Sequence, residues 1–405
     1  MICSVFFLFL ARNKLQANSL LQHSTTTFVS KLRRISSRTT TNMLIHSAPG
    51  ELDNGDEKKE PTEPTEQLNN FEAVCSKSGA YQRNAAKHRH HIDSDTDFPI
   101  EAERYHLHIA LACPWANGVL QLVYLKGLED IISHSVVHPT WGKTSPDPND
   151  DHYGWVYRKP TDEPVANPYG HGSFPCDDSL ILPAYDTGLK SVRQVFNECG
   201  DQTGPYTTPC LYDKVAKRIV SNESMDILRL INNEFNALAK HPDFTLYPQD
   251  EKLKEELEVL NQDVIYPKIN NGVYRSGFAK SQDAYMEAVT DVFDGLELVE
   301  KKLTDQRFLG GDKFTWLDLR LFNTLIRFDP VYVTYFKTNK KRIADYPALL
   351  GFCRDVYSIP EIKQTINMNH IKTHYFTSHA KLNPYGIIPI YDGPDLEAPH
   401  NREDL

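Results

Sequence analysis

The chain has 405 residues, 40% of them hydrophobic, which is enough for two globular domains with cores of their own. Its formal charge of -10 argues against a general nucleic-acid binder. The seven cysteines are odd in number, scattered and without the paired spacing of metal ligands. This usage is typical of a reducing compartment and argues against a disulfide framework.

Residues 1–50 carry six basic residues, no acidic residue and many Ser and Thr, as mitochondrial transit peptides do. The apolar run 2–11 could form a signal-peptide core, but no charged segment precedes it and it is too short to span a bilayer. We expect residues 1–70 to be a disordered targeting segment followed by an acidic linker, and the protein to be mitochondrial. The alternative is an uncleaved tail on a cytoplasmic protein.

Three histidines in a charged segment, His88, His90 and His91, could be read as a metal-binding tract. They have neither Cys partners nor i, i+4 spacing on an apolar helix. We therefore expect a solvated loop and no metal site.

A strand followed by a helix is predicted around a single cysteine. Residues 105–110 alternate apolar and polar, whereas the apolar residues of 119–125 recur at helical spacing up to Gly127. Cys113 lies at the start of this helix, with Pro114 suited to the first helical position. Because free N–H groups and the helix dipole stabilise a thiolate there, Cys113 is the candidate nucleophile. The alternative is a small buried cysteine in a turn.

Residues 131–137 predict a second strand and complete a β-α-β unit. The segment 139–187 is rich in Pro, Gly, Asp and aromatic residues, and predicts a long insertion without strand or helix. The aromatic run around Trp155 inside it could wall a ligand pocket or pin its own loop.

Residues 191–199 predict a helix, and Pro209 lies in the strand segment that follows it. Proline would interrupt the hydrogen bonds of a central strand, so Pro209 lies either on an edge strand of the sheet or in a cis turn. A strand at 217–220 and a helix at 223–231 follow, joined by the run Ser-Asn-Glu-Ser at 221–224. Free N–H groups at this helix start could bind a carboxylate, or the Ser and Asn are only N-caps. From residue 247 onward, apolar helix faces predict an all-helical domain, with Thr315 and Asp318 as a capping pair.

This order of elements resembles the glutathione transferases, a thioredoxin-like domain followed by a helical bundle. The segments LACPWA, INNGVYRSGFA (269–279), LFNTLIRFDPVYV (321–333) and HIKTHYFTSH (370–379) look more narrowly like the glutathionyl-hydroquinone reductases, or Xi class. The resemblance covers about residues 70–395. It implies an α/β thioredoxin-like, glutathione-binding domain at 71–245 and an all-α glutathione transferase C-terminal domain with an extended tail at 246–405.

The resemblance implies an enzyme that removes glutathione from glutathionyl-hydroquinones. Cys113 would attack the glutathione sulfur of the conjugate, and a second glutathione would resolve the Cys113–glutathione mixed disulfide. The residue three after Cys113 is Ala116, so a CxxC resolving thiol is absent and an external thiol must finish the cycle. Glutathione is thus expected as a co-substrate, with no permanently bound cofactor.

Matching positions imply roles for further residues. Tyr274 would donate a proton to the aromatic product, and Tyr332 and Tyr375 would help to lower the thiol pKa. For each tyrosine alone, a core or interface role would be the ordinary interpretation. The glutathione-binding set comprises a tryptophan, the segment around a cis-proline and the γ-glutamyl contacts: Trp155, Tyr206, Thr207, Thr208, Pro209, Glu223 and Ser224.

Four positions depart from the family pattern. Asn117 and Gly118 replace a His-Arg pair, and Gly118 weakens its helix by roughly 1 kcal/mol. Pro205 replaces a basic residue, and Cys210 replaces an aliphatic one. The first three changes put thiol activation and glutathione affinity in doubt, and Cys210 suggests the hypothesis of a disulfide with Cys113.

Two other functions stay open from the sequence. An omega-like thioltransferase or dehydroascorbate reductase would use Cys113 without the three tyrosines, and a noncatalytic glutathione-binding scaffold would need no activated thiol. The expected partners are glutathione and a glutathionyl-quinone-type aromatic substrate, without nucleic acid or stable membrane insertion. The family resemblance implies a homodimer.

Overall fold

The computed structural model describes residues 75–93, 97–176 and 188–405. The predicted targeting segment and linker, and residues 177–187 of the predicted insertion, lie outside the described residues. The described residues belong to one compact unit, Pro61–Leu405. The domain boundary expected between residues 245 and 246 falls inside this unit and stays a prediction.

A four-stranded sheet with the order β2-β1-β5-β6 carries the first half of this unit. β1 (Tyr105–Ile109) pairs in parallel with β2 (Ser133–Val136) and antiparallel with β5 (Cys210–Asp213). β6 (Arg218–Ser221) pairs antiparallel with β5. α2 (Pro114–Leu125) connects β1 to β2, which confirms the predicted β-α-β unit.

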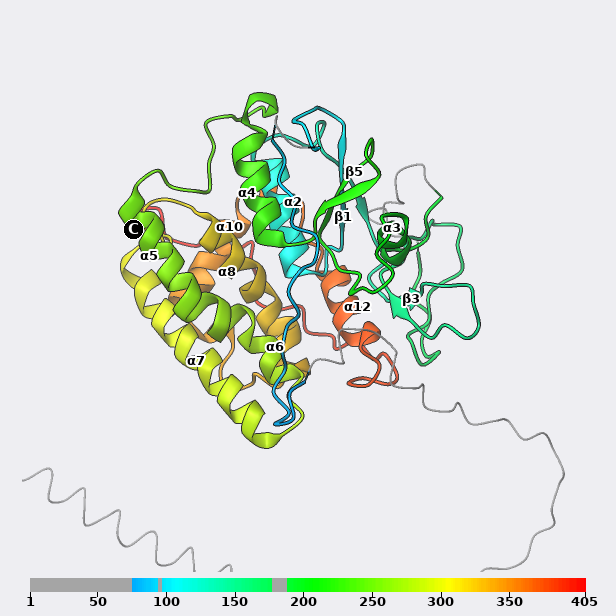
Figure 1. Ribbon diagram of the computed structural model, residues 1–405. Helices are drawn as coiled ribbons and strands as arrows, with labels where there is room; N and C mark the ends of the chain where they lie inside the picture. The colour runs from blue at the N-terminus through cyan, green and yellow to red at the C-terminus, as the bar shows by residue number, and fades with distance from the viewer. Residues whose placement is uncertain (1–74, 94–96, 177–187) are drawn as a thin grey trace, which may run out of the picture. The chain divides into compact units, whose positions relative to one another are not determined.

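The sheet separates two cores, because successive side chains of a strand point to opposite faces. The larger core contains the predicted apolar face of β1 with residues of α2 and of α4 (Ser224–Glu234). The smaller core lies under α3 (Val192–Glu198). Figure 1 shows α2 and α4 on one side of the sheet and α3 on the other. The apolar β1 residues are Tyr105, Leu107 and Ile109.

The insertion after β2 contains a short hairpin-like pairing that the sequence analysis did not predict. β3 (Gly142–Lys143) and β4 (Tyr153–Gly154) pair antiparallel. The prediction of an insertion without strands was therefore wrong at these residues. A pairing of two residues on each side leaves no alternating pattern that a sequence could show.

Helical segments make up the regular structure after β6, as predicted. They are η1 (Asn236–Leu238), α5 (Glu251–Leu260), η2 (Asn261–Asn270), α6 (Gly272–Gly277), α7 (Gln282–Asp305), α8 (Trp316–Arg327), η3 (Phe328–Tyr332), α9 (Val333–Tyr335), η4 (Ile343–Asp345), α10 (Pro347–Tyr357), α11 (Pro360–Lys363) and α12 (Met368–Ser378). Thr315 and Asp318 form the predicted capping box of α8. No helix among residues 75–93, 97–176 and 188–405 combines the length and apolar character needed to cross a bilayer.

Two of these segments, η2 and η3, are π-helical, and each contains a proline, Pro267 and Pro330. Proline has no N–H for the α-helical ladder, and π segments are frequent at functional sites. Tyr266 lies in η2 and Tyr332 lies in η3, so each π-helical segment carries a tyrosine of the candidate functional site.

The histidine segment before β1 is attached to the sheet edge, while His90 and His91 stay exposed, as expected for a solvated loop. Arg89 forms an isolated bridge with Ser221, and the N–H of His90 donates to the carbonyl of Val220 at 2.8 Å. The unpaired backbone groups of an edge strand accept such pairing. Within the described ranges, no group of three or more His, Cys, Asp or Glu side chains is arranged to hold a metal.

Candidate functional site

Cys113 is the N-cap of α2, with Pro114 at the first helical position, as predicted. Its backbone is extended, and its carbonyl accepts the N–H of Asn117 at 2.9 Å, which is the first turn of the helix. Its half-buried side chain places Sγ 3.5 Å from the carbonyl oxygen of Thr208. The Thr208–Pro209 peptide is cis, which confirms one of the two alternatives given for Pro209.

Aromatic side chains surround the sulfur in a cavity of about 110 Å³. The Trp155 ring stacks on His374 at 4.4 Å between centroids, and Trp141 meets Trp155 edge-on at 5.8 Å. The insertion supplies both tryptophans and α12 supplies His374. The aromatic lining comprises Trp115, Trp141, His152, Tyr153, Trp155, Tyr206, Tyr274, His374, Tyr375 and His379. A lining of this kind suits an aromatic ligand.

Contacts between the insertion and α12 close one side of this cavity. The hydroxyl groups of Thr140 and Thr377 lie 2.9 Å apart, and the N–H of Trp141 donates to Ser378 Oγ at 3.0 Å. Figure 1 shows α12 next to the strands of the first half and to the insertion strand β3. The cavity wall therefore depends on segments more than 200 residues apart in the chain.

Three tyrosines form a chain of hydroxyl groups at the inner end of the cavity. The hydroxyl oxygens of Tyr274 and Tyr375 are 2.6 Å apart, and those of Tyr332 and Tyr375 are 3.1 Å apart. Tyr274 and Tyr375 line the cavity with Cys113. Tyr332 is not part of the wall and reaches it through Tyr375, so any influence on the thiol pKa passes through that neighbour. Its phenol is buried behind Tyr375 because η3 packs against the inner side of α12.

Burial raises the pKa of all three phenols above the ordinary value of tyrosine. The charges of Tyr332 and Cys113 raise the pKa of Tyr274 further. The three side chains are therefore neutral O–H donors at neutral pH. Tyr274 and Tyr375 can donate a proton or a hydrogen bond into the cavity, and Tyr332 can donate to Tyr375.

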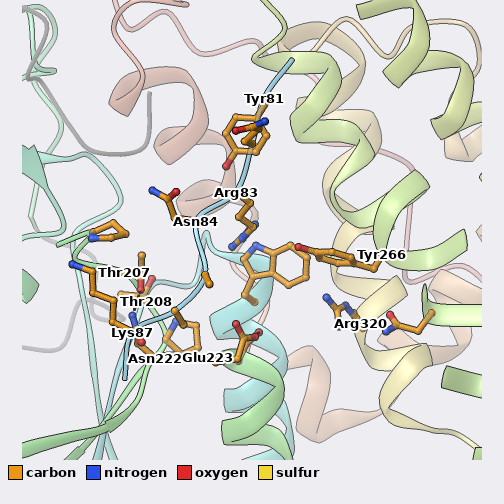
Figure 2. Close-up of a pocket in the computed structure, with 18 residues that line it drawn as sticks. Tyr81, Arg83, Asn84, Lys87, Thr207, Thr208, Asn222, Glu223, Tyr266 and Arg320 are labelled. Atoms are coloured by element: carbon orange, nitrogen blue, oxygen red, sulfur yellow. Dashed lines mark hydrogen bonds between the residues drawn. The ribbon is translucent and has the colours of Figure 1, made fainter. Parts of the chain in front are cut away.

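A second cavity of about 460 Å³ adjoins the first (Figure 2). The two share Arg83, Trp115, Pro205, Thr207 and Thr208, so they form one cleft. The larger cavity extends to the start of α4, between the segment 81–87 and the helical half of the unit.

Glu223 and Ser224 begin α4 in the larger cavity. Glu223 is the N-cap, and its Oε1 accepts the N–H of Met225 at 3.3 Å and the Ser224 hydroxyl at 3.4 Å. The cap is therefore Glu223, and neither Ser221 nor Asn222 has that role. Asn222 instead donates from Nδ2 to Thr207 Oγ1 at 3.0 Å, which ties the helix start to the cis-proline segment.

The structure brings nearly all predicted site residues to this cleft. Cys113, Tyr274 and Tyr375 line the smaller cavity, and Tyr332 lies behind it. The predicted glutathione contacts divide between the cavities: Trp155 and Tyr206 line the smaller one, Pro209, Glu223 and Ser224 line the larger one, and Thr207 and Thr208 line both. The roles assigned to these residues remain predictions.

The departures from the family pattern have different structural consequences. Asn117 is fully buried, donates from Nδ2 to the Thr365 carbonyl at 3.1 Å and accepts from Arg327 Nη2 at 2.9 Å. A Cβ at Gly118 would meet only Asn323 Nδ2, at 3.6 Å, so no close contact requires glycine there. Pro205 follows a second cis peptide and lines both cavities.

The proposed disulfide between Cys113 and Cys210 is not formed, because both are free thiols. Cys210 is fully buried in the smaller core on β5, and burial raises the pKa of its thiol well above the usual value. It lines neither cavity. Its strand position therefore directs it into the core.

Five residues of the cleft come from distant elements and are not among the predicted site residues. Arg83, Trp115, Tyr266 and Arg320 line the larger cavity, and His374 lines the smaller one. Trp115 lies in the LACPWA segment and His374 in HIKTHYFTSH, so the family motifs marked both residues. Nothing local marks the other three, because each becomes part of the site only through tertiary contacts.

The chain is similar to glutathione transferases over most of its length. A family model described as the glutathione S-transferase C-terminal domain matches residues 282–355. The chain is 41% identical over 340 residues to the glutathionyl-hydroquinone reductase YqjG of Escherichia coli, covering 81% of this chain and 94% of that protein. The glutathione-bound structure of YqjG aligns with a TM-score of 0.66 at 40% identity, over 78% of this chain and 96% of the other. The glutathione transferase Xi of Phanerochaete chrysosporium aligns with a TM-score of 0.68 at 39% identity, over 79% and 99%.

Proposed function

The chain belongs to the glutathionyl-hydroquinone reductases, the Xi class of glutathione transferases, and we propose that it reduces glutathionyl-hydroquinones to hydroquinones at Cys113. The predicted fold class, a thioredoxin-like domain followed by an all-α glutathione transferase domain, is confirmed. The chain is thus an enzyme of the glutathione transferase family, with glutathione as its co-substrate.

One observation carries this function, namely the placement of Cys113, Tyr274 and Tyr375 in one aromatic cavity. A thiol exchanging disulfides needs no proton donor for a carbon atom. A hydroquinone leaving group does, and the Tyr274–Tyr375 hydroxyl pair, 2.6 Å apart, lies in the same cavity as the sulfur. The geometry therefore favours the reductase over the thioltransferase and scaffold alternatives.

In the proposed reaction, Cys113 is the nucleophile and Tyr274 is the proton donor. The Cys113 thiolate forms an S–S bond with the glutathione sulfur while the bond between that sulfur and the ring carbon breaks. The electron pair stays on the ring carbon, which takes a proton from Tyr274, and the hydroquinone leaves. A second glutathione then attacks the mixed disulfide, so that oxidised glutathione leaves and Cys113 returns to the thiolate. The thiol proton that the second glutathione loses replaces the proton given up by Tyr274, and the hydroxyl chain of Tyr375 and Tyr332 can share the phenolate charge until then.

Steady-state turnover of a glutathionyl-hydroquinone, with mass spectrometry of the protein, tests this function. Cys113→Ala should abolish turnover and the glutathione adduct, whereas Cys199→Ala, which changes another half-buried thiol outside both cavities, should retain them. Tyr274→Phe should slow hydroquinone formation by about 10²- to 10⁴-fold, the usual contribution of a positioned proton donor.

A mixed-disulfide substrate separates the reductase from a thioltransferase. Thiol–disulfide exchange with this substrate transfers no proton to a carbon atom. Tyr274→Phe should therefore turn over the mixed disulfide at close to the wild-type rate. Equal losses on both substrates, or a Cys113 that never carries glutathione during turnover, would contradict the proposed reaction.

The cellular setting of this activity remains a proposal. The basic, Ser- and Thr-rich composition of residues 1–50 supports mitochondrial targeting, with a cytoplasmic protein as the alternative. Homodimer formation is implied by the family resemblance, and exposed apolar side chains of the tail are available for a contact between subunits. These are Leu382, Tyr385, Ile387, Ile390 and Tyr391.

A further inference from the structure

The imidazole of His374 lines the smaller cavity together with Cys113, and stacking fixes the plane of its ring. The ring lies on that of Trp155, with 4.4 Å between the centroids and an angle of 26° between the planes. His379 meets it edge-on, with 5.3 Å between the centroids. Only 6% of His374 is exposed. The direction of each ring nitrogen is therefore set by the packing of α12 against the insertion.

One ring nitrogen of His374 is occupied by the backbone of the insertion. Nδ1 lies 3.0 Å from the carbonyl oxygen of Pro139 and 3.0 Å from Ser378 Oγ. A carbonyl oxygen only accepts, so Nδ1 carries the hydrogen and donates it to Pro139. The Ser378 hydroxyl donates to the same carbonyl at 3.2 Å. This tautomer places the lone pair of the ring on Nε2.

The second nitrogen of His374 is an uncharged acceptor that opens on the cavity. Among the residues that the structure describes, none forms a hydrogen bond with Nε2, and this nitrogen is not closed off from solvent. Burial lowers the pKa of His374 well below its usual value, and the charge of His379 acts in the same direction. The ring is therefore neutral at neutral pH, and its lone pair is available to a ligand.

This acceptor complements the hydroxyl groups of a hydroquinone. The phenols of Tyr274 and Tyr375 supply O–H donors to the same cavity, whereas Nε2 supplies a lone pair. Each ring hydroxyl of a hydroquinone carries a hydrogen that needs an acceptor once water is excluded. A quinone has carbonyl oxygens at these positions, which accept and cannot donate. The lone pair of His374 therefore favours the reduced ring over the oxidised one.

We infer that His374 Nε2 accepts a hydrogen bond from a ring hydroxyl of the glutathionyl-hydroquinone and thereby selects the reduced aromatic ring. This inference rests on the proposed function, because it assumes that the aromatic ring of the conjugate occupies the smaller cavity. It makes His374 a specificity-determining residue. Trp155 holds the imidazole plane, and the Pro139 carbonyl holds the tautomer.

Steady-state kinetics of the full chain with three conjugates tests the assignment. The substrates are the glutathione conjugate of hydroquinone and the two monomethyl ethers of that conjugate, each of which lacks one hydroxyl hydrogen. Wild-type protein should turn over at least one ether with a kcat/KM about tenfold to hundredfold below that of the parent conjugate. A loss of this size is expected where a site built for a hydroxyl group meets an analogue without it.

His374→Phe separates the lone pair from the bulk of the methyl group. Phenylalanine keeps a flat ring against Trp155, and the Pro139 carbonyl keeps the Ser378 hydroxyl as a partner. The variant should lose about tenfold to hundredfold in kcat/KM on the parent conjugate and little on the disfavoured ether. The preference for the parent should therefore disappear. A preference caused by the size of the methyl group would persist.

His152→Phe is the matched control, because His152 is another imidazole of the same cavity. Its Nδ1 lies 2.8 Å from Thr144 Oγ1, and burial lowers its pKa to about 4, so it is also neutral. This variant should retain the preference for the parent conjugate over the ether.

Nitrogen-15 NMR of wild-type protein keeps the inference testable if His374→Phe folds poorly. The unprotonated nitrogen of a neutral imidazole changes its chemical shift when it accepts a hydrogen bond. Saturating hydroquinone, the reaction product, should shift one such resonance. The same concentration of 1,4-dimethoxybenzene, which has no hydroxyl hydrogen, should shift none.

Three results would overturn the inference. These are a preference that survives in His374→Phe, a preference that disappears in His152→Phe, and a nitrogen spectrum that hydroquinone leaves unchanged. The proposed function is tested separately by the glutathione adduct of Cys113. Wild-type protein that forms no adduct with any conjugate would contradict the function. Wild-type protein that uses all three conjugates equally well would contradict only the role of His374.

Discussion

Arg327 has the largest fully buried side chain in the described part of the protein, and it reaches the loop that precedes the nucleophile. Its Nε donates to the Ala112 carbonyl and its Nη2 to the Leu111 carbonyl, both at 2.9 Å. Nη2 also donates to Asn117 Oδ1 at 2.9 Å. A residue at the end of α8 thus holds the backbone on one side of Cys113 and the first turn of α2 on the other.

Asn117 is expected to stabilise this arrangement. Asn117→Leu keeps the side-chain size but leaves an Arg327 N–H and the Thr365 carbonyl without their buried partner. Each unsatisfied buried group costs about 1–3 kcal/mol, so urea unfolding should show a loss of at least that size. The rate of Cys113 alkylation should fall as well, because the loop before the sulfur loses a support.

Gly118→Ala is the matched control at the next position. Its Cβ would meet only Asn323 Nδ2 at 3.6 Å, and alanine favours the helix over glycine by about 1 kcal/mol. It should therefore be neutral or stabilising. A destabilised Gly118→Ala together with a neutral Asn117→Leu would refute this account of the helix start.

At the scale of the element, α6 and α9 determine how the tyrosines pack. Phe336, at the end of α9, stacks on Tyr332 at 5.2 Å and contacts Tyr274 at 5.5 Å between ring centroids. Gly277, at the end of α6, faces this phenylalanine ring, and a Cβ there would overlap it. The missing side chain of Gly277 therefore lets Phe336 support the phenol chain.

Gly277→Ala should displace Phe336 and the tyrosines that pack on it. Overpacking of a buried site typically costs about 1–3 kcal/mol, which thermal or urea unfolding would measure. Hydroquinone formation should slow more than exchange with a mixed disulfide, because only the former uses the phenols. Wild-type stability with unchanged activity in Gly277→Ala would show that the contact does not matter.

At the scale of the whole molecule, buried neutral histidines make stability depend on pH. Burial lowers the pKa of His108 and His379 from 6.5 to about 3. The unfolded chain binds protons at these positions below pH 6.5, whereas the folded chain does so only near pH 3. Their contribution to stability is thus fully present above pH 6.5 and is lost as the pH falls towards 3.

Replacing one of these histidines should flatten the acid limb of the stability profile. His108→Asn should remove about 2 kcal/mol of the stability difference between pH 7.5 and pH 5, measured by urea unfolding at each pH. Tyr157→Phe is the control, because it removes the 2.6 Å hydrogen bond to His108 Nδ1 without removing the titrating ring. An identical pH profile for His108→Asn and wild type would disprove the prediction.

The sequence by itself determined the features that arise within a few residues of one another. Cys113 before Pro114, the alternation of 105–110 and the Thr315–Asp318 cap are local patterns, because helix starts and strand faces depend on neighbouring residues. The family resemblance added the tyrosines and the glutathione contacts, nearly all of which line the cleft.

Only the tertiary structure decided which distant side chains share a cavity. Trp115, Glu223 and Arg320 come from α2, the start of α4 and α8, and no local pattern relates them. The same is true of the place of Tyr332 behind Tyr375, the burial of Cys210 and the pairing of β3 with β4. Packing between elements far apart in the chain sets these positions. The same packing places two aromatic rings and the Glu223 carboxylate near the charge of Arg320.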